Sequence, residues 1–291
     1  MGCLNPDKES TTRKWFANIH LSGPCNRACY FCIGQHMMNL DPLNTLDTPP
    51  AQMKGIVDFI EECQKRGVTE VNITGSNTDP LLYRHTDVLV HDLKDKYAGF
   101  TTVGVRTNGV LSRREDIWGL YDKISISLAS TDEAVYAKMM GFGSPPDVQR
   151  FVDSGKPVKV NIVLGSQNLK NRDILSTIID LSDMGVRQIN LREPYGQPRV
   201  YAQAVKAMTN SGWERIDHVH GMMRWLVPGV GGVNTEVTLW DVHYVEVESV
   251  NLYANGRVSL DYSVTKGCSE DGKTLDQRHF KTEGRVREQW Q

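Results

Sequence analysis

Short apolar runs and amphipathic stretches alternate along the first two thirds of the chain. The apolar runs predict six strands, at residues 15–22, 68–74, 101–106, 123–128, 157–164 and 186–192. Apolar residues at helical spacing predict helices at 51–66, 81–97, 112–121, 131–140 and 172–184. This alternation predicts an α/β protein whose parallel strands are joined by right-handed crossovers. The periodicity fits both a doubly wound sheet and a partial barrel.

The pattern changes after residue 198. We expect helices at 201–208 and 213–226, followed by strands at 235–239, 245–253 and 257–262. Asn255-Gly256 between the last two strands is a hairpin signal. The chain therefore divides into an N-terminal segment (1–14), a βα region (15–200) and an α+β extension (201–291) that we expect to close part of the open side or mouth of the βα region.

Composition excludes several classes of protein. Hydrophobic residues make up 40% of the 291 positions and charged residues 23%, which is typical of a globular protein. The net charge of −2 gives no overall attraction to nucleic acid or to an anionic membrane. No apolar run approaches the roughly 20 residues that span a bilayer, and residues 1–10 lack a secretory signal. We expect a cytoplasmic protein without a membrane partner.

Three of the six cysteines lie within eight residues, in the segment Cys25-Asn-Arg-Ala-Cys29-Tyr-Phe-Cys32. Three thiolates this close can converge on one soft metal centre, while their loop is too short for comfortable disulfides. One interpretation is a [4Fe–4S] cluster held by three cysteines, which leaves one iron without a protein ligand. A zinc ion with His36 as fourth ligand is the second, and chance clustering of thiols is the third. The spacing favours the cluster.

These residues and several later motifs, in the same order, resemble the radical S-adenosylmethionine (SAM) superfamily. CNRACYFC is similar to its CxxxCxxC cluster motif, and the style of the later motifs is similar to the subgroup of the molybdopterin-biosynthesis cyclase. Those motifs are Thr74-Gly-Ser-Asn-Thr-Asp-Pro-Leu-Leu82, Arg106-Thr-Asn-Gly109, Ile124-Ser-Ile-Ser-Leu128 with Asp132, Glu133 and Tyr136, Val158-Lys-Val-Asn161, and Asn190-Leu-Arg-Glu193.

The resemblance implies a partial (β/α)6 TIM-type barrel with ligand sites at the carboxyl ends of its strands. It also implies one [4Fe–4S] cluster and SAM as cofactors. In the family, an electron from the cluster cleaves SAM to methionine and a 5′-deoxyadenosyl radical, which abstracts hydrogen from the substrate. A flavodoxin- or ferredoxin-like electron donor is the implied protein partner.

The resemblance also implies roles for individual residues. Cys25, Cys29 and Cys32 would ligate the cluster. The residues expected to contact SAM are Phe31 beside the adenine, Gly75, Ser76 and Thr107 near the methionine end, Ser127 near the ribose or carboxylate, Asn161 at a ribose hydroxyl, and Arg192 at a carboxylate of SAM or substrate. Strand alternation turns Ser125 to the same face as Ser127, so the pattern does not separate them.

The motif after the second strand departs from the family. The usual Gly-Gly-Glu-Pro glutamate, which can meet the methionine ammonium, is missing. Asp79 keeps the order of acid before proline, and we expect it to replace the glutamate. The alternative is that Asp79 only caps a turn.

The substrate is less defined than the cofactors. Cys268 is the only cysteine after Cys63, so a second cysteine-bound cluster is not expected. The leading hypothesis is rearrangement, cyclisation or C–C bond formation on a small molecule or nucleotide. A peptide or nucleic-acid base is the second, and a non-catalytic zinc- or cluster-binding module is the third. Candidate substrate contacts after the sixth strand are Glu193, Tyr195, Gln197 and Arg199.

Overall fold

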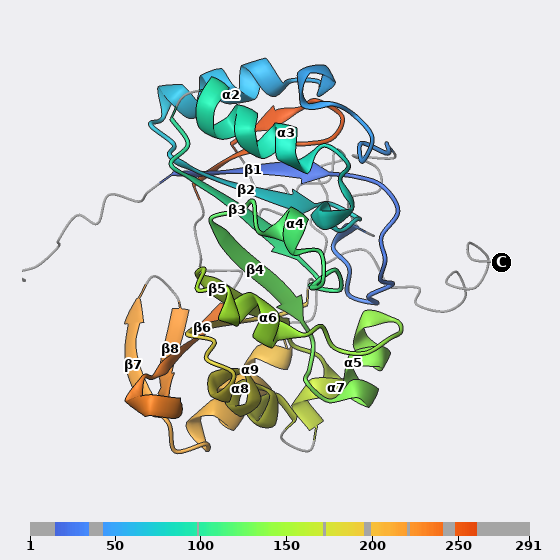
Figure 1. Ribbon diagram of the computed structural model, residues 1–291. Helices are drawn as coiled ribbons and strands as arrows, with labels where there is room; N and C mark the ends of the chain where they lie inside the picture. Colours follow the sequence, from blue (N-terminus) through green and yellow to red (C-terminus); the bar gives the residue numbers. More distant parts are fainter. Residues whose placement is uncertain are drawn as a thin grey trace, which may run out of the picture.

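The architecture is a mostly parallel sheet with helices packed along it (Figure 1). The computed structural model describes residues 15–34, 43–97, 99–170, 173–194, 199–219, 222–240 and 248–260. In these residues eleven strands form one sheet in the order β11-β10-β1-β2-β3-β4-β5-β6-β9-β8-β7. Its central strands are β1 (Phe16–Leu21), β2 (Glu70–Gly75), β3 (Thr102–Thr107), β4 (Lys123–Leu128), β5 (Val158–Val163) and β6 (Gln188–Arg192).

The six predicted strands of the βα region are confirmed, each within two residues of its expected ends. They lie side by side in chain order and are all parallel. A doubly wound sheet would reverse its strand order at a switch point, whereas a barrel proceeds in one direction. The structure therefore supports the partial-barrel expectation, and the sheet is not closed.

The helices follow the strands as predicted, with shorter bounds. They are α2 (Ile56–Lys65), α3 (Thr86–His91), α4 (Glu115–Trp118), α5 (Glu133–Met140), α6 (Val148–Asp153), α7 (Ser166–Leu169), α8 (Asp173–Asp183) and α9 (Arg199–Thr209). Short helical turns add η1 (Pro50–Gln52), η2 (Pro80–Leu82), η3 (Asp92–Lys96) and η5 (Val230–Gly232). Within the described residues, every helix is too short or too polar to cross a membrane.

The helix expected at 81–97 is interrupted near its start. Tyr83 takes an extended conformation after η2, so its ring is buried and its hydroxyl donates to the Thr48 carbonyl oxygen at 2.7 Å. The regular helix α3 begins only at Thr86, whose hydroxyl donates back to the Tyr83 carbonyl at 2.9 Å.

Strands from the C-terminal part of the chain extend the sheet at both edges. β9 (Thr235–Trp240) pairs in parallel with β6, and β10 (Ser249–Leu252) pairs in parallel with β1. β11 (Val258–Ser259) returns antiparallel to β10. The predicted Asn255-Gly256 hairpin is confirmed, and Gly256 supplies the positive φ of 91° that the turn needs.

The helix predicted at 213–226 is wrong. This segment forms two antiparallel strands, β7 (Glu214–Val219) and β8 (Met222–Val227), and β8 also pairs with β9. Apolar residues near every third position imitate a helical stripe. The decisive pattern is the alternation in β8, where Trp225 and Val227 are buried and their neighbours are not. Pairing with β9 satisfies the backbone of β8 and overrides the local pattern.

The two faces of the sheet differ in chemistry. In β4, Ile124 and Ile126 are buried in the core under the helices, while Lys123, Ser125 and Ser127 point to the opposite side. We call this second side the inner face, because it corresponds to the interior of the partial barrel. The strand registers place mostly polar side chains on it from β1 to β9.

Truncation of Trp225 tests the strand assignment. Trp225 is 1% exposed and pairs with Val237 of β9, so Trp225→Ala should lower the free energy of unfolding by about 3–5 kcal/mol. Leu226→Ala, on the other side of the strand, should cost about 1 kcal/mol or less. Urea denaturation of both variants gives the comparison, and equal losses would contradict the alternation.

Candidate functional site

The three clustered cysteines lie on the loop that follows β1. Cys25, Cys29 and Cys32 are half-buried and, like the buried Cys63 of α2, are not in disulfides. Burial raises the pKa of the Cys25 thiol to about 11 and that of Cys29 to about 12, and the neighbouring thiols raise both pKa values further. Three thiols that disfavour each other's charge are a donor set that a bound metal centre would stabilise.

The spacing of these thiols bears on the kind of centre. In the described part of the chain, no three His, Cys, Asp or Glu side chains lie close enough to hold a single metal ion. A [4Fe–4S] cluster takes each thiolate on a separate iron, so it suits ligands that stand further apart. The three cysteines therefore fit a cluster better than one zinc ion. His36, the expected fourth zinc ligand, lies outside the described residues.

Contacts with α5 hold the cysteine loop in place. The Ala28 amide donates to the Met140 carbonyl at 3.1 Å, and Arg27 Nε donates to the Tyr136 hydroxyl at 3.2 Å. The Arg27 guanidinium also lies 5.2 Å from the centroid of the Phe142 ring. The loop thus rests on the βα unit that follows β4, although it belongs to the unit of β1.

The loop after β2 closes against the cysteine loop. Asn77 Oδ1 accepts from the Ser22 hydroxyl at 2.9 Å, and the Thr78 hydroxyl donates to the Pro24 carbonyl at 2.6 Å. Gly75 makes the turn possible, because a Cβ there would overlap the Thr78 carbonyl oxygen. Glycine at this position is explained by the loop's own closure, whatever it also does for a ligand.

Asp79 is the centre of a buried hydrogen-bond network. Its carboxylate is 2% exposed and accepts from the Leu81 amide (2.9 Å), the Asn108 amide (2.6 Å) and the Thr107 hydroxyl (2.8 Å to Oδ2). Burial raises the pKa of Asp79, while these hydrogen bonds act in the opposite direction. The carboxylate caps η2 and joins the loops after β2 and β3. The capping alternative thus describes its contacts in the structure.

Asn108 continues the network toward the cysteines. Its side-chain amide donates to Asn26 Oδ1 at 2.6 Å and lies 3.9 Å from Cys25 Sγ. A chain of contacts therefore runs from the β2 loop through Asp79 and Asn108 to the first cysteine. Hydrogen bonds to ligating sulfurs tune iron–sulfur centres, so this arrangement is suited to support one.

The residues expected to contact SAM fall into three groups. Thr107 and Asp79 bond each other inside the protein. Ser76 is buried, and its Oγ has no hydrogen-bond partner among the described residues, which leaves a polar atom for a ligand at the end of β2. Half-buried Phe31 packs on the core with its ring 5.3 Å from that of Tyr30, and Ser127, Asn161 and Arg192 lie on the inner face.

The inner-face residues are linked to each other. The Asn161 side chain donates to Ser125 Oγ at 2.6 Å and accepts from Asn190 Nδ2 at 3.4 Å. The Arg192 guanidinium lies over the Trp240 ring, 4.8 Å from its centroid. Ser127 is directly opposite Asn161 in the strand register.

The predicted substrate contacts after β6 have mixed outcomes. Glu193 is buried and accepts from the Tyr201 amide at 2.7 Å, so it anchors the start of α9. Tyr195 and Gln197 lie outside the described residues. Arg199 is the first residue of α9.

Sequence reasoning missed two cations on the inner face. Arg106 and Lys159 both face Ser125 across the strand register, one from β3 and one from β5. Burial lowers the pKa of Lys159 to about 8, with further contributions from Arg192, Arg106 and Lys123, while Glu236 raises it. The signal was present in the sequence, because each residue alternates with buried valines on its strand.

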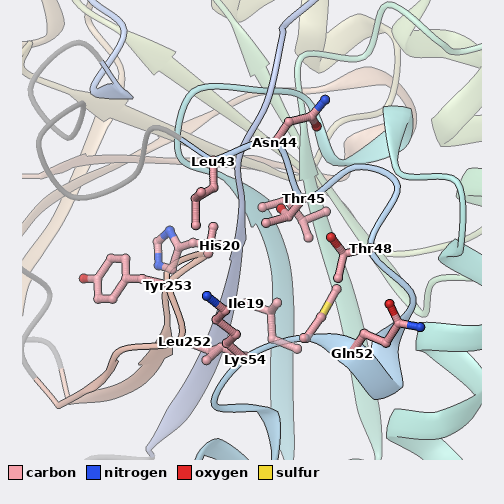
Figure 2. A pocket seen from close by; sticks show the side chains of 13 residues that line it. Ile19, His20, Leu43, Asn44, Thr45, Thr48, Gln52, Lys54, Leu252 and Tyr253 are labelled. Atoms are coloured by element: carbon pink, nitrogen blue, oxygen red, sulfur yellow. The ribbon is translucent and has the colours of Figure 1, made fainter.

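A cavity of about 210 Å³ borders the inner face near β1 (Figure 2). Figure 2 shows the His20 and Tyr253 rings on one side of it and Thr48, Gln52 and Lys54 on the other. The two rings stack with centroids 4.8 Å apart. Burial, with help from Arg106, lowers the pKa of His20 to about 4, so this imidazole is neutral at pH 7.

Comparison with known proteins matches this arrangement. The profile of the Radical SAM superfamily matches residues 19–178, more than half of the chain. No curated protein sequence matches. Among solved structures, SuiB from Streptococcus suis is similar at 14% identity and a TM-score of 0.58, over 86% of this chain and 61% of that chain. This chain thus spans less than two thirds of the length of SuiB.

Two further structures extend the comparison. SuiB bound to its precursor peptide SuiA superposes with a TM-score of 0.59 at 14% identity, over 91% of this chain and 63% of that chain. The enzyme anSMEcpe with bound AdoMet is 11% identical, with a TM-score of 0.49, over 68% of this chain and 60% of that chain. At these identities the likeness to SuiB concerns the fold.

Removal of the Asp79 carboxylate should destabilise the protein. Asp79→Ala leaves two backbone amides and one hydroxyl without their acceptor, so the free energy of unfolding should fall by at least about 2 kcal/mol. Asp183→Ala, at the exposed end of α8, should stay within about 0.5 kcal/mol of wild type. Denaturant titrations measure both, and an unchanged stability for Asp79→Ala would contradict the network.

Lys159 should make stability depend on pH in a defined window. Its folded pKa of about 8 lies below the ordinary 10.5, so the unfolded state binds more protons between these values and stability should rise with pH there. Lys159→Met should remove this rise and increase the free energy of unfolding at pH 7 by about 1 kcal/mol. Urea unfolding at pH 7 and 9.5 tests it, with exposed Lys138→Met of α5 as control. A less stable Lys159→Met would show that the lysine is structural.

Proposed function

This chain belongs to the radical SAM superfamily and is an enzyme, and we propose that Cys25, Cys29 and Cys32 hold a [4Fe–4S] cluster that acts on SAM. The supporting observation is the placement of three cysteines, none of them in a disulfide, on one loop at the carboxyl end of β1. Ligand sites of barrel enzymes lie at this end of the strands. The buried Ser76 hydroxyl at the end of β2 offers a polar contact beside the loop.

The cluster, when bound, supplies the electron that cleaves SAM to methionine and a 5′-deoxyadenosyl radical. The protein's own part is to place the reactants and exclude water. Asp79 and Asn108 fix the loops around Cys25 through their hydrogen bonds, so we assign Asp79 a positioning role in place of direct contact with SAM. Ser127, Asn161 and Arg192 on the inner face remain our candidates for SAM contacts, with Phe31, Gly75, Ser76 and Thr107 along the rim.

We place a small molecule or nucleotide on the inner face as substrate. The polar and charged side chains of this face support that choice, because they suit a compact ligand with several hydrogen-bonding groups. SuiB has been seen with a precursor peptide, so a peptide is the second candidate. A flavodoxin- or ferredoxin-like protein would deliver the electron.

The first experiment is anaerobic. The protein is reconstituted with iron and sulfide, given SAM and dithionite, and assayed for 5′-deoxyadenosine. We expect this product, and we expect Cys29→Ala to lower its yield at least a hundredfold because one cluster ligand is lost.

Cys63→Ala is the matched control, because Cys63 is buried in α2 within the hydrophobic core and away from the cysteine loop. Its activity should stay within about threefold of wild type, apart from any loss of folded protein. Equal loss in both variants would contradict the ligand assignment. Iron bound without SAM binding would favour a cluster-binding module.

A further inference from the structure

We infer that Arg106 and Lys159 bind a carboxylate or phosphate group of the substrate on the inner face. This inference rests on the proposed function, because it names the chemical class of the molecule that the enzyme acts on. It starts from two cations whose position nothing in the cluster or SAM site requires.

The register places the two cations on one ligand-sized area. Arg106 and Lys159 are each paired with Ser125, so they project from β3 and β5 on either side of β4 and on the same face. Strands lie about 4.8 Å apart, which puts the two Cα atoms about 10 Å from each other. Two long cationic side chains at this separation reach a common anion, and Ser125 lies beneath it.

The acidic side chains nearby are already engaged. Glu70 pairs with Lys123, and Glu236 accepts from Arg224 at 3.3 Å. Among the described residues, no carboxylate lies within ion-pair distance of Arg106 or Lys159, and the recorded contact of the Arg106 guanidinium is the Phe16 ring at 5.9 Å. The pairs cancel, so the inner face keeps a local excess of positive charge.

This excess is costly unless an anion joins it. Lys159 is half-buried, and Arg106, Arg192 and Lys123 all disfavour its charged form, against Glu236 alone in its favour. Buried cations in proteins are normally paired. A carboxylate or phosphate between Arg106 and Lys159 supplies the missing partner and converts mutual repulsion into binding energy.

The test measures anion binding by the reconstituted enzyme under anaerobic conditions with saturating SAM. Citrate probes the carboxylate source and inorganic pyrophosphate the phosphate source, each titrated calorimetrically at matched ionic strength. We expect wild type to bind at least one probe. Arg106→Gln and Lys159→Gln should each weaken that binding at least tenfold.

Three controls separate charge from folding. Arg106→Lys keeps the charge and should stay within threefold of wild type. Lys65→Gln and Arg84→Gln remove exposed surface charges and should change affinity less than twofold. Melting temperatures identify any variant that is not folded, and Lys159→Gln should melt no lower than wild type.

A pH series adds a second readout. Citrate affinity should fall as the pH rises from 7 to 9.5, because Lys159 then loses its proton, and Lys159→Gln should abolish that dependence. The charged groups that face this lysine are Arg106, Lys123, Arg192 and Glu236.

The outcomes separate the inference from the proposed function. If wild type cleaves SAM but binds neither probe, the anion site is wrong and the function stands. If SAM displaces the probe, the cations serve the carboxylate of the cofactor, and the inference is overturned. If the probes bind with the expected variant pattern but SAM is never cleaved, the anion site is supported and the proposed function is contradicted.

Discussion

The buried carboxylate of Asp79 is the point on which the arrangement of the catalytic loops depends. It lies where the chain leaves β2 and receives hydrogen bonds from the turn that follows β3, so two loops from different βα units share one acceptor. Asn108 then extends the connection to Asn26 beside the first cysteine. Loops are ordinarily the most mobile parts of a barrel enzyme. Here a charge with almost no exposed surface makes three of them a single unit, at the cost of its own desolvation.

Much of the fold follows from the sequence because strand and helix patterns agree with the tertiary structure in the βα region. Alternation in Lys123–Leu128 predicts both the bounds of β4 and its two faces. The same reasoning fails at 213–226, because β8 takes its structure from β9, a pairing that the local pattern does not contain. It also does not predict that β9 and β10 join opposite edges of the sheet, since which strands pair is a property of the whole chain.

The candidate site was predictable to a different degree. The spacing of Cys25, Cys29 and Cys32 identifies the cysteine loop directly. The environment of Asp79 does not follow from its place before a proline, because its partners Thr107 and Asn108 come from the next unit. Arg106 and Lys159 are ordinary charged residues in sequence, and their importance emerges only when parallel registers bring them to either side of Ser125. Chemistry within one loop can be recognised from sequence, while chemistry shared across strands needs the fold.

The parallel pairing of β10 with β1 has a consequence for how the protein is made. β1 carries the cysteine loop and emerges early from the ribosome, yet one of its two neighbours consists of residues Ser249–Leu252. Until those residues are synthesised, that edge of β1 presents unpaired backbone groups. Such long-range pairings form slowly and expose nascent chains to aggregation. The strand that leads into the metal-binding loop is therefore among the last elements to be completed, so the order of cluster insertion relative to synthesis matters to this chain.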